Sequence, residues 1–173
     1  SDREASGVLS AAQRHTHFLD SPRMAHTLSA STFSFKDLKQ DTASVFLVLP
    51  PEQLPTYNRW LRLLVTQSLR ELSTGKKPQK RILYLLDEFA ALGYLASIEQ
   101  AMGLMAGYGI QLWPILQDMA QLKSIYKQRA GTFLSNSGVL QIFGVNDHET
   151  AQHVSNLMGQ TTVQFDSVSM SRG

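Results

Sequence analysis

Short apolar runs alternate with longer segments of helical periodicity along most of this 173-residue chain, and this alternation constrains its fold more than any other feature. The run at residues 43–49 is apolar at every position except Ser44, so both faces of a strand built from it are apolar. Central strands of a parallel sheet need this pattern because helices cover both sides of such a sheet. We therefore predict an α/β fold with a mostly parallel sheet, flanking helices and right-handed connections.

The expected elements follow one another in chain order. Strands are predicted at residues 43–49, 82–86, 110–116 and 138–143. Helices are predicted at residues 3–19, 22–28, 55–73, 96–106, 120–127 and 147–157, with Asp147 as the N-cap of the last. The Ser- and Thr-rich residues 29–42 are expected to form a loop. Pro114 is unusual inside a strand, because proline cannot donate a ladder hydrogen bond.

Composition fits one ordinary domain, since 43% apolar and 17% charged residues are enough to bury a core. The formal net charge of +2 is too small to argue for a nucleic-acid partner by itself. The absence of cysteine excludes disulfides and thiolate metal sites. No apolar run reaches the roughly 20 residues of a membrane helix, and no signal peptide is recognisable. Because the chain begins with Ser1 and its last residues carry no helix or strand pattern, we expect a piece of a longer protein.

The segment 81–88 joins five apolar residues to two adjacent carboxylates, Asp87 and Glu88. Functional groups of α/β sheets collect at the carboxyl ends of strands, where these two acids are expected to lie. This is the Walker B pattern, in which Asp87 holds magnesium through water and Glu88 polarises the water that attacks a γ-phosphate. Successive strand residues point in opposite directions, which suits two different targets. The alternative is that both acids cap the following helix.

A glutamine stands at the end of the next predicted strand, in Leu116-Gln117-Asp118. At the tip of a strand beside Walker B, Gln117 can hydrogen-bond a γ-phosphate or position water, and so act as a sensor. Taken by itself, Gln117 is better explained as an ordinary polar strand end. Together with Asp87 and Glu88, it forms a candidate catalytic constellation.

No phosphate-binding loop accompanies these residues. Such a loop requires Gly, four residues, then Gly-Lys-Ser/Thr. The nearest approach is Gly75-Lys76, where Lys77 stands at the hydroxyl position and Arg70 at the first glycine position. Without backbone amides and a lysine to hold phosphates, this chain by itself is expected to bind ATP poorly or not at all. The prediction is thus half of a RecA-like P-loop NTPase domain, lacking the phosphate-loop strand.

Basic residues gather in two places along the chain. They are Lys76, Lys77, Lys80 and Arg81 in one turn, and Lys123, Lys127 and Arg129 in another. Either cluster can follow the phosphates of a nucleic acid, with salt-sensitive contacts. The alternative is that both are simply solvated surface.

Several sequence blocks, in the same order along the chain, resemble the type IV secretion coupling proteins of the TraG/TraD kind. The blocks are residues 7–22, 85–93, 105–109, 116–122 and 143–151. The resemblance covers nearly the whole chain, and it matches Asp87 and Glu88 to the Walker B acids and Gln117 to the sensor glutamine of that family.

The resemblance implies the cytoplasmic domain of a bacterial inner-membrane protein that forms a homo-hexameric ATPase using ATP and Mg²⁺. Such a motor hands DNA, or a relaxase–DNA complex, to components of a secretion channel during conjugation. Its phosphate loop lies upstream of an all-α insert. Residues 1–42 then form a helical segment and loop after that insert, residues 43–160 the RecA-like core, and residues 161–173 a domain edge or tail.

The resemblance leaves some assignments open. Some relatives carry an arginine finger in the helix after Walker B, but residues 104–106 offer no arginine, so Arg59, Arg62 and Arg129 all remain candidates. A non-catalytic docking module of the same machinery and a related DNA-pumping ATPase are the alternative functions. Self-association of the chain is also expected, because a sheet without its phosphate-loop strand exposes an edge and apolar surface.

Overall fold

The computed structural model describes residues 2–159, and its centre is a two-stranded parallel sheet. Strand β1 (Ile82–Leu86) pairs with β2 (Ile110–Pro114) in a register that sets Ile82 opposite Ile110 and Leu86 opposite Pro114. The crossover between them runs through helix α4 (Ala96–Leu104). The predicted parallel α/β unit is confirmed, and Pro114 is accommodated as the last residue of its strand.

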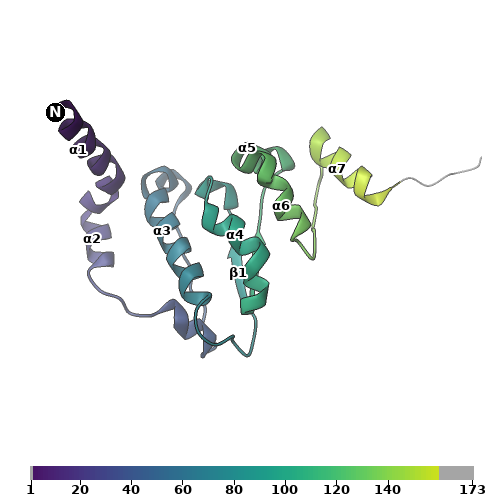
Figure 1. Ribbon diagram of the computed structural model, residues 1–173, viewed down its shortest axis with the longest axis horizontal. Helices are drawn as coiled ribbons and strands as arrows, with labels where there is room; N and C mark the ends of the chain where they lie inside the picture. Colours follow the sequence, from purple (N-terminus) through teal and green to yellow (C-terminus); the bar gives the residue numbers. More distant parts are fainter. Residues whose placement is uncertain (1, 160–173) are drawn as a thin grey trace, which may run out of the picture.

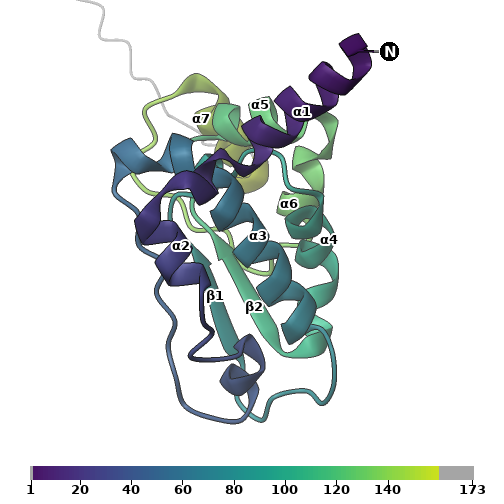
Figure 2. The same ribbon diagram turned by 90° about the vertical axis from the view of Figure 1, so that its left-hand side faces the viewer.

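The other helices follow the predicted order, with shifts of a few residues at their ends (Figures 1 and 2). They are α1 (Asp2–Thr16), α2 (Pro22–Leu28), α3 (Leu54–Leu72), α5 (Met119–Tyr126), α6 (Ala130–Ser135) and α7 (His148–Met158). Short 3-10 helices are η1 (His17–Asp20), η2 (Phe35–Lys39), η3 (Pro51–Gln53), η4 (Phe89–Leu92), η5 (Met105–Tyr108) and η6 (Lys127–Arg129). The sequence pattern predicted neither α6 nor η2, the latter lying in the expected loop. No helix within residues 2–159 has the length and apolar character needed to span a membrane.

The core lies between one face of the sheet and helices α3 and α4. Val65, Leu69 and Leu72 of α3 are buried in the same cluster as Leu86 and Ile110 of the strands. Burial of each such side chain stabilises the fold by about 1.5–3 kcal/mol. The sheet and α3 are also joined by a polar contact, because the hydroxyls of Ser68 and Tyr84 lie 2.7 Å apart.

The predicted strands at residues 43–49 and 138–143 are wrong, because both segments run as irregular chain. A strand exists only by pairing with a neighbour, and within residues 2–159 only β1 and β2 pair. Most of the apolar side chains of both segments are consequently open to solvent, with Phe46 83% and Phe143 82% exposed. The apolar pattern predicts that both segments are buried, but the described part of the chain does not bury them.

The second face of the sheet is exposed as well, although helices were expected on both faces. Leu83 and Leu85 of β1 and Trp113 of β2 point away from α3 and α4, and Leu85 is 52% exposed. Contiguous apolar surface of this kind marks an interaction surface. Helices α3 and α4 both cover the opposite face, on which Tyr84 and Leu86 of β1 pack into the core.

We expect the 173-residue chain to self-associate in solution through this exposed sheet face. Light scattering after size exclusion should give a mass above that of the monomer and rising with concentration. The double change Leu83→Lys and Leu85→Lys should shift the chain toward monomer by placing charges on the face. The control, Leu9→Lys with Leu63→Lys, changes two leucines that are equally exposed on α1 and α3. A monomeric wild-type chain at high concentration would contradict the expectation.

Candidate functional site

The two predicted acids lie in a turn directly after β1, at the carboxyl end of the sheet. Leu86, which precedes them, is buried, whereas Asp87 and Glu88 are exposed. Two backbone hydrogen bonds tie this turn to the end of β2. The Ile115 amide donates to the Leu86 carbonyl at 2.9 Å, and the Phe89 amide donates to the Ile115 carbonyl at 3.3 Å. Hydrogen bonds to the end of the neighbouring strand therefore hold the backbone of the turn that carries the two acids.

Helix α3 supports the same turn from its other side. Asn58 and Arg62 lie one helical turn apart and donate to the carbonyls of Ala91 and Leu92, respectively. These carbonyls belong to η4, which starts immediately after Glu88 and is anchored by buried Phe89. The spacing of four residues places Asn58 and Arg62 on one face of α3, but it does not by itself indicate a role for Asn58.

Gln117 lies at the corresponding end of β2, in the turn that leads into α5. Its backbone amide donates to the Gln121 side-chain oxygen at 3.0 Å. The Gln121 amide in turn donates to the Asp118 carboxylate at 2.7 Å, so Asp118 is the N-cap of α5. Within residues 2–159 no hydrogen bond engages the Gln117 side-chain amide or the carboxylates of Asp87 and Glu88. All three groups are exposed and available to a ligand.

Helix α7 packs against α5 beside this turn. The buried Thr150 hydroxyl accepts a hydrogen bond from the Met119 amide at 3.1 Å, at the first residue of α5. The predicted N-cap is confirmed, because the Asp147 carboxylate accepts the Thr150 amide at 2.8 Å. This hydrogen bond holds the pKa of Asp147 below its usual range. A second contact pairs Lys123 of α5 with Glu149 of α7. The sequence pattern indicated the cap but not the Thr150 contact.

The chemistry of these groups suits a magnesium ion that arrives with phosphates. Asp87, Glu88 and Gln117 stand at the same edge of the sheet, since the ends of β1 and β2 lie side by side. Mg²⁺ prefers oxygen ligands and is usually held by one or two carboxylates together with substrate phosphates. Within residues 2–159 no three acidic or histidine side chains cluster closely enough to hold a metal by themselves. The acid pair thus fits shared, water-mediated coordination.

The three candidate arginines all have partners within this chain. Arg59 donates to the carbonyl of Arg14, Arg62 to the carbonyl of Leu92, and Arg129 to the Glu99 carboxylate. The bond to Glu99, which is buried on α4, raises the pKa of Arg129 above its ordinary value. The Arg129 side chain is nevertheless 67% exposed.

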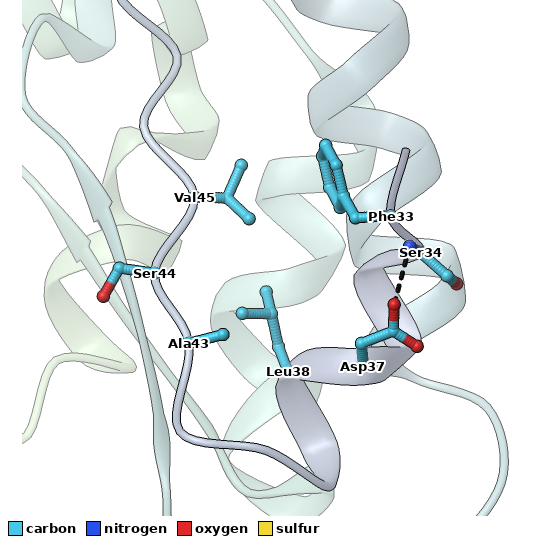
Figure 3. Close-up of a pocket in the computed structure, with 7 residues that line it drawn as sticks. All are labelled: Phe33, Ser34, Asp37, Leu38, Ala43, Ser44 and Val45. Carbon is cyan, nitrogen blue, oxygen red and sulfur yellow. Dashed lines mark hydrogen bonds between the residues drawn. The ribbon is translucent and has the colours of Figure 1, made fainter. Parts of the chain in front are cut away.

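A hollow of about 280 Å³ lies elsewhere, beside η2 (Figure 3). Phe33, Leu38 and Val45 turn their side chains toward it, whereas the Ser44 side chain points away. Its one acid, Asp37, already accepts the Ser34 amide at 2.9 Å. The hollow includes none of the predicted site residues, and its lining contains no basic side chain that could pair with a phosphate.

A parallel sheet with helices on one face, whose two strands end at the same edge, forms part of a RecA-like α/β fold. Solved structures of the conjugative coupling protein TrwB share it. The unbound TrwB structure superposes with a TM-score of 0.62, at 24% identity over 79% of this chain and 32% of that one. TrwB in complex with ADP and Mg²⁺ superposes with a TM-score of 0.58 over 79% of this chain and 33% of TrwB, again at 24% identity.

The chain belongs to the family described as Type IV secretory system Conjugative DNA transfer, whose model matches residues 1–173. A probable conjugal transfer protein TraG from Sinorhizobium fredii is 34% identical over 169 residues. That match covers 96% of this chain and 26% of the TraG protein. The chain therefore spans about a quarter of the length of the relatives it matches, and the predicted family is confirmed.

Proposed function

We propose that this chain is the acid-and-sensor half of the ATPase site in a motor that couples DNA to a type IV secretion channel during conjugation. The observation that carries the proposal is the acidic turn after β1, hydrogen-bonded to the end of β2 beside Gln117. Family membership and the likeness to TrwB, one structure of which is described with ADP and Mg²⁺, support it.

Each site residue has one role in this proposal. Asp87 would hold the magnesium ion through water, and Glu88 would accept a proton from the water that attacks the γ-phosphate. Gln117 orients that water or hydrogen-bonds the phosphate. The metal, when bound, neutralises charge that develops on the phosphate oxygens. The buried residues and backbone bonds around the turn hold the backbone that carries Asp87 and Glu88.

The rest of the site is proposed to come from elsewhere in a longer protein. A phosphate loop upstream of an all-α insert would supply the amides and lysine that this chain lacks. Residues 1–42 would follow that insert, residues 43–160 would complete the RecA-like core, and residues 161–173, which lie outside the described part, would form its edge. The exposed sheet face and the unpaired segments 43–49 and 138–143 would then be covered.

The proposed motor is a homo-hexamer, the cytoplasmic domain of a bacterial inner-membrane protein. Its partners are DNA or a relaxase–DNA complex and components of the secretion channel. An arginine finger from a neighbouring subunit remains unassigned among Arg59, Arg62 and Arg129. Each of the three guanidinium groups makes one hydrogen bond within residues 2–159 and keeps further N–H donors that could contact a neighbour's phosphate.

The test is a titration with a fluorescent ATP analogue and Mg²⁺. We expect tight binding only when the chain is joined to the upstream half that carries the phosphate loop. The 173-residue chain alone should bind at least 100-fold more weakly, since each lost phosphate contact removes a charge-assisted hydrogen bond of about 1.5–3 kcal/mol. Equal binding by the two proteins would contradict the proposed division of the site.

A second candidate is a docking module of the same machinery that performs no chemistry. The exposed apolar face of the sheet, with Leu83, Leu85 and Trp113, is the observation that favours it. Nucleotide dependence separates the two, because a docking module engages its partners equally with ATP, with ADP or with neither. A related DNA-pumping ATPase is a third candidate, which the family match disfavours.

A further inference from the structure

Basic side chains gather at the amino end of the sheet, opposite the candidate nucleotide site. They come from two segments, η2 and the connection between α3 and β1, which Figure 2 shows together at the lower end of the molecule. We call this surface the basic rim. Its members are all exposed: Lys36, Lys76, Lys77, Lys80 and Arg81.

The rim is built on anchored backbone. The ammonium group of Lys39 donates to the carbonyls of Thr74 and Lys76 at 2.5 and 3.1 Å, which ties η2 to the connection. Pro78 is buried and lies close against Gly109, where an added Cβ would meet its ring at 3.1 Å. The Gly109 carbonyl also accepts the Ile82 amide at 3.0 Å, at the start of β1. The charges are thus presented from a fixed position.

The charge of the molecule is concentrated here. Residues 34–41 and 70–81 contain seven of the 16 Lys and Arg residues and three of the 14 Asp and Glu residues. These segments therefore carry +4, while the whole chain carries +2 and the remainder is net negative. Two of the three acids are already engaged, Asp37 by the Ser34 amide and Glu71 by the side chains of Ser34 and Gln67. Within residues 2–159 no ion pair involves a rim residue.

We infer that the basic rim binds the phosphate backbone of DNA. A group of Lys and Arg side chains without ion-pair partners is typical of a polyanion-binding site. Such a site binds phosphates and does not recognise base sequence. The inference rests on the proposed function in one respect, the choice of DNA as the polyanion. The inference adds the place at which DNA contacts this chain. That place is distant from Asp87 and Glu88, because β1, which is about 17 Å long, separates them from the rim.

The test is DNA binding by the 173-residue chain, measured by fluorescence anisotropy with labelled single-stranded and duplex oligonucleotides over a series of salt concentrations. The rim variant carries Lys76→Gln, Lys80→Gln and Arg81→Gln. For single strands, each lost phosphate contact lowers the slope of log affinity against log salt by about 0.7. The rim variant should therefore show a slope shallower by about 2 and an affinity about 100-fold lower at 0.1 M salt.

Two further variants keep the result decisive. Arg3→Gln, Arg14→Gln and Arg23→Gln remove the same charge from α1 and α2 and should change binding little. Lys76→Arg, Lys80→Arg and Arg81→Lys keep the charge and should keep the affinity. This result would show that the rim variant binds weakly because it lacks phosphate contacts and not because it is unfolded. An equal loss of DNA affinity in the α1/α2 variant would overturn the inference. Binding would then depend on the net charge of the chain and not on the rim.

Three other outcomes would also overturn the inference that the rim binds DNA. They are wild-type binding by the rim variant, no DNA binding by the wild-type chain, and rim-dependent binding to phosphatidylglycerol vesicles in place of DNA. A failure of the DNA-binding inference can be distinguished from a failure of the proposed function. The anisotropy measurement contains no nucleotide, whereas the proposed function is read from nucleotide binding at the opposite end of β1.

Discussion

Replacing Glu88 by glutamine is expected to abolish ATP hydrolysis while leaving Mg²⁺–ATP binding nearly unchanged. Glutamine keeps the shape of the side chain but cannot accept the proton of the attacking water. Loss of a general base costs about 10²–10⁴-fold in rate. Because Glu88 is exposed and no hydrogen bond within residues 2–159 engages its carboxylate, the change should not disturb folding. Phosphate release by the protein that joins this chain to its phosphate loop measures the effect.

Glu52→Gln is the matched control, because it removes the same charge from an exposed glutamate in η3, an element outside the acidic turn. Its turnover should equal that of the wild type. Turnover by the Glu88→Gln enzyme within a factor of two of the wild type would contradict the role of Glu88. Such a result would favour the alternative in which the acids only start the following helical turn, whose first residue is Phe89.

The elements nearest the candidate site are those that the sequence predicts best. The run at residues 82–86 coincides with β1, and the run from residue 110 starts with β2. The run at 82–86 is continuously apolar and ends with β1, whereas the run from 110 includes Gln111 and continues two residues past the end of β2, to Leu116. Asp87, Glu88 and Gln117 then fall at one edge of the sheet, because parallel strands end on the same side.

The runs at residues 43–49 and 138–143 have the same apolar pattern but do not form strands. Apolar patterning reports that a segment is buried in an assembled fold, whereas a strand also needs a hydrogen-bonding neighbour. In the described part of the chain that neighbour is missing, and Phe46 and Val139 stay exposed. Periodicity alone cannot distinguish these cases.

Polar contacts that hold the site in place are the least predictable part. Asn58 and Arg62 reach the carbonyls of Ala91 and Leu92 across about 30 residues of sequence. The contact of Thr150 with the Met119 amide spans a similar separation. Such bonds depend on the packed positions of two elements and leave no local pattern. The residues that carry chemistry were therefore predictable, and those that position them were not.

Replacing Phe89 by alanine is expected to cost about 3–5 kcal/mol in the free energy of unfolding, the usual range for a buried phenylalanine. Phe89 is 1% exposed and follows Glu88 directly. Its ring stacks on Tyr126 with centroids 5.7 Å apart and contacts Phe133 at 5.6 Å. Alanine leaves a cavity between η4, α5 and α6 and removes these ring contacts, each worth about 0.5–1.5 kcal/mol beyond burial.

Urea unfolding followed by circular dichroism measures this cost, and Phe46→Ala is the matched control. Phe46 undergoes the same chemical change at a position 83% exposed to solvent, so its effect should stay within about 0.5 kcal/mol. Equal effects of the two changes would show that the aromatic cluster does not organise the core. A large effect of Phe89→Ala alone would mean that the acidic turn is held by the core itself, because the residue that anchors η4 is the neighbour of Glu88. Site geometry and stability would then depend on the same side chain.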